Sequence, residues 1–250
     1  LKLCWNFTDV SRPAMMHPRW WELSDPDSTE ASAEVVLKSV QSDGHALKLA
    51  PRIFRENREI VLAAVRQHWE ALQWAAPKLK DDHGIVMIAV QQNGTALQWA
   101  GDTARGNLDA CRTAVQVSWW AYEFAADTLR ENYELALLAV RENWQAFRLC
   151  GVGLRGNRSL LMLALRQHWM PLAHADPGLL ADPEVIRAGL RHSHQAFGFA
   201  SSLLRADRSL VIEALTKNPR AIALADSVLQ EEFKTQGFVN AEPPQQELSD

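Results

Sequence analysis

The fold is decided by the stretch from Asn57 to Leu79, which reads NREIVLAAVRQHWEALQWAAPKL. Its apolar side chains recur three and four residues apart, the spacing that places them on one face of an α-helix. Asn57 precedes them and is a residue type that accepts hydrogen bonds from free N–H groups at a helix start. The stretch therefore predicts a helix of about 11 residues, followed by a shorter helical segment from Ala71 to Ala75.

Outward from this stretch, the same pattern recurs every 25 residues from about Glu30 to Gln230. The repeated apolar position is occupied by Val40, Val65, Val90, Val115, Val140, Leu165, Leu190 and Leu215. The repeated capping position is occupied by Ser32, Asn57, Asp82, Asn107, Asn132, Asn157, Asp182 and Asp207. Because helices this short are marginal alone, each repeat must pack on its neighbours. The chain is thus predicted to be all-α, an α-solenoid of eight short two-helix 25-residue repeats.

The repeat also sets the expected domain boundaries. Residues 1–30, which contain Trp5, Trp20 and Trp21, are expected to form an irregular N-terminal cap. Residues 31–236 form the solenoid, and residues 237–250 form a polar acidic tail. Within the repeats, Gly44 and Gly94 are expected to close the first helix in a left-handed conformation. A single apolar residue before each cap, such as Leu79, is expected either on the second helix or on a turn beyond it.

Composition narrows the class of protein. Apolar residues make up 47% of the chain, charged residues 22%, and the net charge is −4. No apolar run of about 18 residues is present, so no membrane-spanning segment is expected. Three cysteines, Cys4, Cys111 and Cys150, give no disulfide framework.

No set of residues predicts catalysis, a cofactor or a metal. His192 and His194 are two residues apart, which points them to different faces of a helix. His68 and His168 share a repeat position with Asn93 and Asn143, so they are interpreted as polar helix ends. Cys111 and Cys150 replace apolar residues and are interpreted as buried small side chains rather than as reactive thiols.

Two sets of residues are candidates for partner binding. The first consists of Trp69, Trp119, Trp144 and Trp169, which occupy the position of Gly44 and Gly94. These rings are expected either to pack between repeats or to contact a partner, because Trp is enriched in interface hot spots. Arg141 and Arg166, late in the first helices of their repeats, are candidates beside them. Cations near helix C-termini are also favourable for purely structural reasons.

A second basic column precedes the caps and consists of Arg55, Lys80, Arg105, Arg130, Arg155 and Arg205. Pairing with neighbouring acids such as Glu131 is one interpretation, and a basic track along the solenoid is the other. Between residues 30 and 230, however, 22 Lys and Arg stand against 21 Asp and Glu. A nucleic-acid surface normally carries a clear basic excess, so nucleic acid is not the expected partner.

The residues from Asn57 to Leu79 also resemble the repeat of the domain-of-unknown-function 4116 family. The run from Val90 to Ala100, VQQNGTALQWA, matches that family's Gln-Asn-Gly turn and the Ala-Leu pair that follows it. This resemblance covers about 200 residues by the repeat count. It implies a source among microbes, including algae, and no assigned chemistry. The chain departs from the pattern where Trp replaces the turn glycine, at Trp69, Trp119, Trp144 and Trp169.

Taken together, the sequence predicts a non-enzymatic helical-repeat scaffold for protein–protein interaction. We expect it to be an accessory subunit of a multi-subunit assembly. One version, by analogy with the algal members, is a peripheral subunit of an organellar, chloroplast or photosynthetic membrane complex. The alternative is a helical-repeat RNA-binding protein.

Overall fold

The computed structural model describes residues 29–235, which form α- and 3-10 helices joined by short turns and contain no β-strand within those bounds. The all-α prediction is thereby confirmed for this part of the chain. The expected cap over residues 1–30, with the exception of the helical Thr29 and Glu30, lies outside the described residues, as does the tail over residues 237–250.

Long α-helices recur along the chain at the predicted places. They are α1 (Thr29–Ser42), α3 (Arg58–Gln67), α5 (His83–Gln92), α7 (Leu108–Val117), α9 (Tyr133–Glu142), α11 (Arg158–Leu165), α12 (Pro183–Leu190) and α14 (Arg208–Lys217). Seven of the predicted caps are confirmed, because the side chains accept from backbone N–H groups at N2 or N3: Asn57, Asp82, Asn107, Asn132, Asn157, Asp182 and Asp207.

The predicted cap at Ser32 is wrong. Helix α1 already begins at Thr29, so Ser32 lies inside it. Later long helices start directly after a short helix that turns the chain, whereas Thr29, Glu30 and Ala31 contain no residue that breaks a helix. The first helix therefore begins four residues earlier than the repeat predicts.

Each long helix is followed by a short 3-10 helix. These are η2 (Gly44–Leu49), η3 (Trp69–Trp74), η4 (Gly94–Trp99), η5 (Trp119–Phe124), η6 (Trp144–Leu149), η7 (Met170–His174), η9 (His194–Phe199) and η10 (Pro219–Leu224). One residue commonly ends the α-helix and caps the 3-10 helix. Asn93, for example, is extended at φ −152° and its side chain accepts from Thr95 N.

The left-handed role predicted for Gly44 and Gly94 is therefore wrong. Both are the first residue of a 3-10 helix, and neither has a positive φ. A Cβ atom at Gly94 would instead collide with the carbonyl oxygen of Ala114 in the next unit, and one at Gly44 with that of Ala64. Glycine is needed here for close approach between backbones of neighbouring units.

A third helical segment closes most units. These segments are α2 (Arg52–Arg55), α4 (Pro77–Lys80), α6 (Asp102–Arg105), α8 (Asp127–Arg130), α10 (Val152–Arg155), η8 (Leu179–Ala181), α13 (Ser202–Arg205) and α15 (Ser227–Thr235). The apolar residue before each cap lies on this segment, as Leu79 does on α4. The prediction of two helices per repeat is thus corrected to three helical segments.

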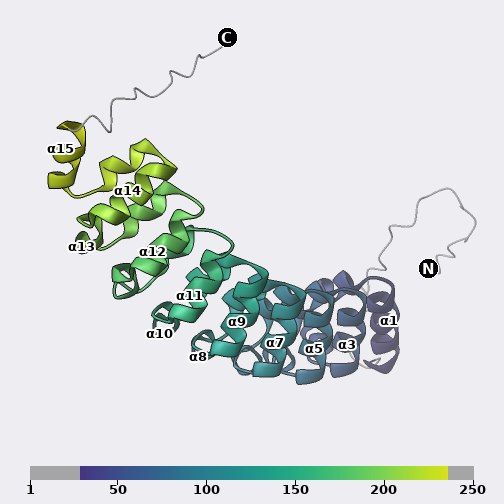
Figure 1. The fold of residues 1–250 in the computed structure, drawn as a ribbon. Helices are drawn as coiled ribbons and strands as arrows, with labels where there is room; N and C mark the ends of the chain where they lie inside the picture. The colour runs from purple at the N-terminus through teal and green to yellow at the C-terminus, as the bar shows by residue number, and fades with distance from the viewer. Residues whose placement is uncertain (1–28, 236–250) are drawn as a thin grey trace, which may run out of the picture.

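The units stack side by side into an elongated, curved body, with the long helices following one another from α1 to α14 (Figure 1). The core runs through the whole stack, and the side chains of Val65, Val90, Val115 and Val140 are fully buried in it. Burial of this column between successive helices was predicted and is confirmed. The arrangement is that of a helical stack consistent with an α-solenoid.

Backbone hydrogen bonds connect the short helices of successive units, which lie along one edge of the stack. A residue before each short helix donates its N–H to a carbonyl at or next to the end of the preceding short helix, at 2.9–3.1 Å: Ala76 to Arg55, Gly101 to Lys80, Ala126 to Arg105, Gly151 to Arg130, Asp176 to Arg155, Ser201 to Leu180 and Asp226 to Arg205. These bonds fix the spacing of adjacent units along this edge.

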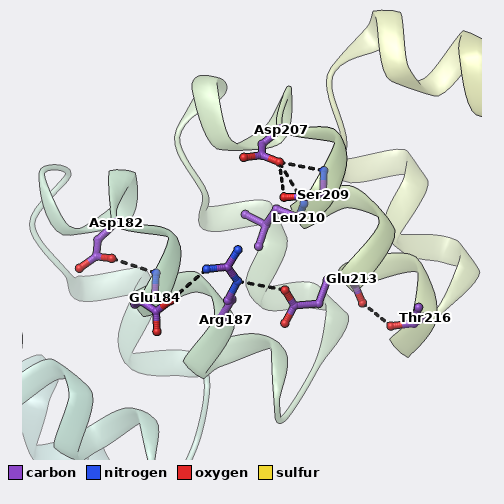
Figure 2. Close-up of polar contacts among 8 residues, drawn as sticks. All are labelled: Asp182, Glu184, Arg187, Asp207, Ser209, Leu210, Glu213 and Thr216. Carbon is purple, nitrogen blue, oxygen red and sulfur yellow. Dashed lines mark hydrogen bonds and ion pairs between the residues drawn. The ribbon is translucent and has the colours of Figure 1, made fainter.

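Side chains also form hydrogen bonds and ion pairs between the long helices of neighbouring units. Gln167 Nε2 donates to the carbonyl of Val140 at 2.8 Å, and Gln92 Nε2 to that of Val65 at 2.6 Å, so each caps the C-terminus of the preceding long helix. Figure 2 shows the outer surface of α12 and α14, where Arg187 lies between Glu184 of its own helix and Glu213 of the next. Neighbouring units are therefore held by polar contacts as well as by the core.

Candidate interaction surface

The four predicted tryptophans lie where the long helices meet the 3-10 helices. Trp69, Trp119 and Trp144 are the first residues of η3, η5 and η6, and Trp169 immediately precedes η7. Each ring packs against the core but remains only half-buried. The two interpretations of this column thus apply to different parts of one side chain: one part packs between units, and the rest faces outward.

The tryptophans belong to a larger set of rings, most of which stack across unit boundaries, whereas Trp119 and Trp120 contact each other edge-on within one unit. The ring centroids of Trp69 and Trp99 are 5.0 Å apart, with an angle of 24° between the ring planes. Those of Trp144 and His168 are 4.5 Å apart with an angle of 14°, and those of Trp169 and Phe199 are 5.9 Å apart. We call this set the aromatic row: Trp69, Trp99, Trp119, Trp120, Trp144, His168, Trp169 and Phe199. Centroid distances of 4.5–7 Å are those of favourable aromatic pairs.

Several members of the aromatic row were missed in the sequence. Trp99 and Phe199 end their 3-10 helices, whereas Trp69 lies at the start of one, so they belong to different repeat positions. The available signal was the aromatic or large apolar side chain that recurs at the last 3-10 position, as in Trp74, Trp99 and Phe124. Only the stacking of units reveals that the two positions meet.

Arg141 and Arg166 lie at the C-terminal ends of long helices. Arg141 is in the last turn of α9 and Arg166 caps α11, and both side chains are exposed. Neither guanidinium forms an ion pair within residues 29–235. Each arginine precedes a tryptophan of the row by three residues, namely Trp144 and Trp169.

The second basic column has mainly structural contacts. Arg105 and Arg130 pair with Asp102 and Asp127 on their own short helices. Arg155 donates to the carbonyl oxygens of Cys150 at 3.0 Å and of Arg148 at 3.1 Å, which caps the end of η6. These contacts favour the pairing interpretation over a continuous basic track.

An open depression of about 540 Å³ lies between α8 and α10 beside this column. Arg130, Arg148 and Arg155 line it together with Asp127 and Glu131. The acids offset the arginines, so the depression does not present a purely cationic surface.

Histidines and cysteines in the described part of the chain have local structural roles. His68 Nδ1 accepts from Glu70 N at 3.3 Å, which fits the predicted polar helix end. The ring of His192 bonds through Nε2 to the carbonyl of Leu165 at 2.7 Å, as Gln92 and Gln167 do in their units. Burial raises the pKa of the thiols of Cys111 and Cys150 to about 11, so both stay protonated at neutral pH.

These observations define the class of protein: an all-helical repeat protein whose units are joined by a continuous core. Residues 33–80, 57–103 and 182–230 match the family model described as domain of unknown function, DUF4116. The resemblance to this family is confirmed over these residues, so the chain carries DUF4116 repeats; the match does not extend over the whole of the predicted array. No curated protein and no solved structure matches the chain. None of the helices between residues 29 and 235 has the length and apolar character needed to cross a membrane.

Proposed function

We propose that this chain is a non-enzymatic α-solenoid scaffold of eight 25-residue units that binds another protein along the aromatic row. The observation that carries the proposal is the row itself, in which rings of neighbouring units stack at Trp69 with Trp99 and at Trp144 with His168 while each ring keeps an exposed part. The unit count is supported by the seven caps spaced 25 residues apart from Asn57 to Asp207, with α1 before them. A solenoid offers its partner similar side chains at regular intervals along one surface.

The chemistry of the row indicates the kind of partner. Tryptophan supplies a large apolar area with little conformational entropy to lose, and it is enriched among the residues that dominate binding energy. Exposed Arg141 and Arg166, each three residues from a tryptophan, favour a partner segment in which apolar side chains alternate with acidic ones. An accessory subunit docked on a larger assembly would use its surface in this way.

RNA binding is the alternative, and stacked rings are the feature that favours it, because bases stack on exposed aromatic side chains. Against it, Arg105, Arg130 and Arg155 are engaged with acids or with carbonyl oxygens of their own units. The near balance of charge along the repeats leaves little capacity to neutralise phosphates.

The test is affinity purification of the full chain from its native source, followed by mass spectrometry. The variant carries Arg141→Glu and Arg166→Glu, which alter exposed side chains and leave the core untouched. We expect it to lose the partner recovered with the wild type while it remains folded, with only a small fall in melting temperature because both charges lie at helix C-termini. The matched control is Lys78→Glu, an exposed lysine on α4, which should keep the partner. Recovery of the same partner with both variants would contradict the proposal.

A further inference from the structure

A cluster of histidine and glutamate side chains lies at the junction of the first two units. His45 belongs to η2, while His68 caps η3 and Glu70 is its second residue. One potential ligand atom from each of the three lies within 4.8 Å of the other two. His45 and Glu70 are 25 residues apart, so stacking of adjacent units brings them together.

The surroundings of His45 are unusual because both ring nitrogens face a carboxylate. Nδ1 lies 3.1 Å from Asp43 Oδ1, and Nε2 lies 3.2 Å from Glu70 Oε2. When Nδ1 donates its proton to Asp43, Nε2 presents a lone pair to the carboxylate of Glu70. Two acceptors face one another in that state, so the contact is favourable only when a proton or a metal cation lies between them.

We propose that His45, His68 and Glu70 bind one divalent transition-metal ion of the zinc class. Imidazole nitrogen and carboxylate oxygen are ligands of such ions, and three protein ligands with a water in the fourth position form a common tetrahedral arrangement. Metal–ligand bonds of about 2.0–2.2 Å place neighbouring ligand atoms about 3.3 Å apart. The present 3.2 Å between His45 Nε2 and Glu70 Oε2 already meets this requirement.

Asp43 completes the site as an orienting residue. A metal-bound histidine usually donates its other ring N–H to a carboxylate, which fixes its tautomer. The contact of His45 Nδ1 with Asp43 has this arrangement. Metal binding by His68 through Nδ1 would replace its 3.3 Å bond to Glu70 N, a long hydrogen bond that is weak in comparison with a metal–ligand bond.

Neighbouring rings hold the two imidazoles in place while leaving the site accessible. The centroids of His45 and His68 are 4.2 Å apart, and His45 also lies 5.6 Å from Trp74. The side chains of His45 and Glu70 are 43% and 36% exposed, so an ion from solvent can reach them. Bound metal would cross-link η2 to η3 and stabilise the junction between the two units.

The chain supplies its own control at the corresponding place further along. His168 occupies the repeat position of His68, and its Nδ1 likewise caps a 3-10 helix by accepting from Met170 N at 3.1 Å. Gln145 and Met170, however, stand where His45 and Glu70 are in the first pair of units. His168 thus has the local geometry of His68 without the other two ligands.

The experiment titrates the tag-free, metal-free full chain with Co²⁺ and, separately, with Zn²⁺. We expect one equivalent of Co²⁺ to produce the visible absorption of a tetrahedral site and Zn²⁺ to raise the melting temperature. His45→Gln and Glu70→Gln should each weaken Zn²⁺ binding by at least about tenfold, and Asp43→Asn by about 10–100-fold. Asparagine caps the 3-10 helix at Asn93 and Asn143, so Asp43→Asn preserves folding.

His168→Gln is the control and should bind Zn²⁺ as the wild type does. Circular dichroism of each metal-free variant verifies that it is folded. The proposal is overturned if the wild type gives neither Co²⁺ absorption nor a Zn²⁺-dependent rise in melting temperature. It is equally overturned if His45→Gln and Glu70→Gln bind Zn²⁺ within about twofold of the wild type.

Discussion

At the residue scale, the apolar column contributes much of the stability through complete burial. Val90 of α5 has no exposed surface, and its methyl groups fill space between successive long helices. Val90→Ala should lower the free energy of unfolding by about 1–3 kcal/mol, because transfer energy is lost and a cavity remains. Equilibrium denaturation of the full chain measures this change.

The matched control for that prediction is Val117→Ala. Val117 ends α7 with 48% of its surface exposed, so its truncation should change the free energy of unfolding by less than about 0.5 kcal/mol. Equal effects of the two substitutions would mean that the valine column is not the core.

At the element scale, carboxylates bond the first N–H groups of four of the short segments, in one of two ways. In one, an acid of the preceding unit reaches across: Asp81 accepts from Ala104 N at 3.0 Å and Glu131 from Gly153 N at 3.2 Å. Gly101 and Gly151 make this possible, since a Cβ atom at either would collide with that acid.

In the other way, the residue before the short helix caps its own segment. Asp176 accepts from Gly178 N at 2.8 Å and Asp226 from Val228 N at 3.0 Å. The position of the reaching acid is then occupied by a small residue, Gly156 or Ala206. The capping carboxylate therefore comes either from the same unit or from the preceding one. Which of the two occurs depends on the residues at two positions that are 20 apart in the sequence.

This pairing predicts a strong coupling between Glu131 and Gly151. Gly151→Asp alone should destabilise the fold because the new carboxylate crowds and repels Glu131. Adding Glu131→Gly gives positions 131 and 151 the residue types found at the equivalent Gly156 and Asp176. The loss of unfolding free energy in the double variant should therefore be smaller, by about 1–3 kcal/mol, than the sum of the two single losses. A double-mutant cycle by urea denaturation measures the coupling, and simple additivity would contradict the exchange of caps.

Ion pairs between long helices predict a pH dependence. The hydrogen bond from Arg58 Nε to Asp82 Oδ2, at 2.8 Å, lowers the pKa of Asp82, and Arg158 lowers the pKa of Asp182 in the same way. A carboxyl group whose pKa is depressed on folding stabilises the protein above its unfolded pKa, about 3.9. That contribution is lost as the pH falls through the lower, folded value.

The test replaces both arginines, as Arg58→Gln with Arg158→Gln. The variant should be less stable than the wild type at about pH 6, and the difference should shrink towards about pH 2.5 as the aspartates become protonated. Because the side chains of Arg58 and Arg158 are 56% and 52% exposed, the effect should be small and should weaken with salt. A difference that grows on acidification would refute this assignment.

At the scale of the whole molecule, the charge distribution predicts the response to nucleic acid. Between residues 30 and 230, 22 Lys and Arg stand against 21 Asp and Glu, and inter-unit pairs such as Arg187 with Glu213 bring opposite charges together (Figure 2). Binding of single-stranded RNA should therefore be weak and should disappear by about 0.2 M salt, because few counterions are released. Fluorescence anisotropy against salt measures this, and sequence-selective nanomolar binding at physiological salt would favour the RNA-binding alternative instead.

The sequence by itself determined the period, the helix starts and the buried column. These features are local, since a cap accepts from N–H groups two or three residues away, as at Asn57, and an apolar stripe follows the turn of one helix. Burial of Val65 between units followed because no helix of this length buries its stripe alone. The candidate residues were selected on the same local grounds, Trp69 as a departure from the repeated pattern and Arg141 as a member of a recurring basic column.

Only the tertiary structure decided what meets across the boundary between units. The third helical segment, the close approach at Gly94, the exchange of caps at Gly151 and the stacking of Trp69 on Trp99 all involve contacts between residues about 20–30 positions apart. Which of these residues touch depends on the rise and rotation from one unit to the next. That geometry is set jointly by the core and by the inter-unit hydrogen bonds, so it is not encoded in the pattern of any single repeat.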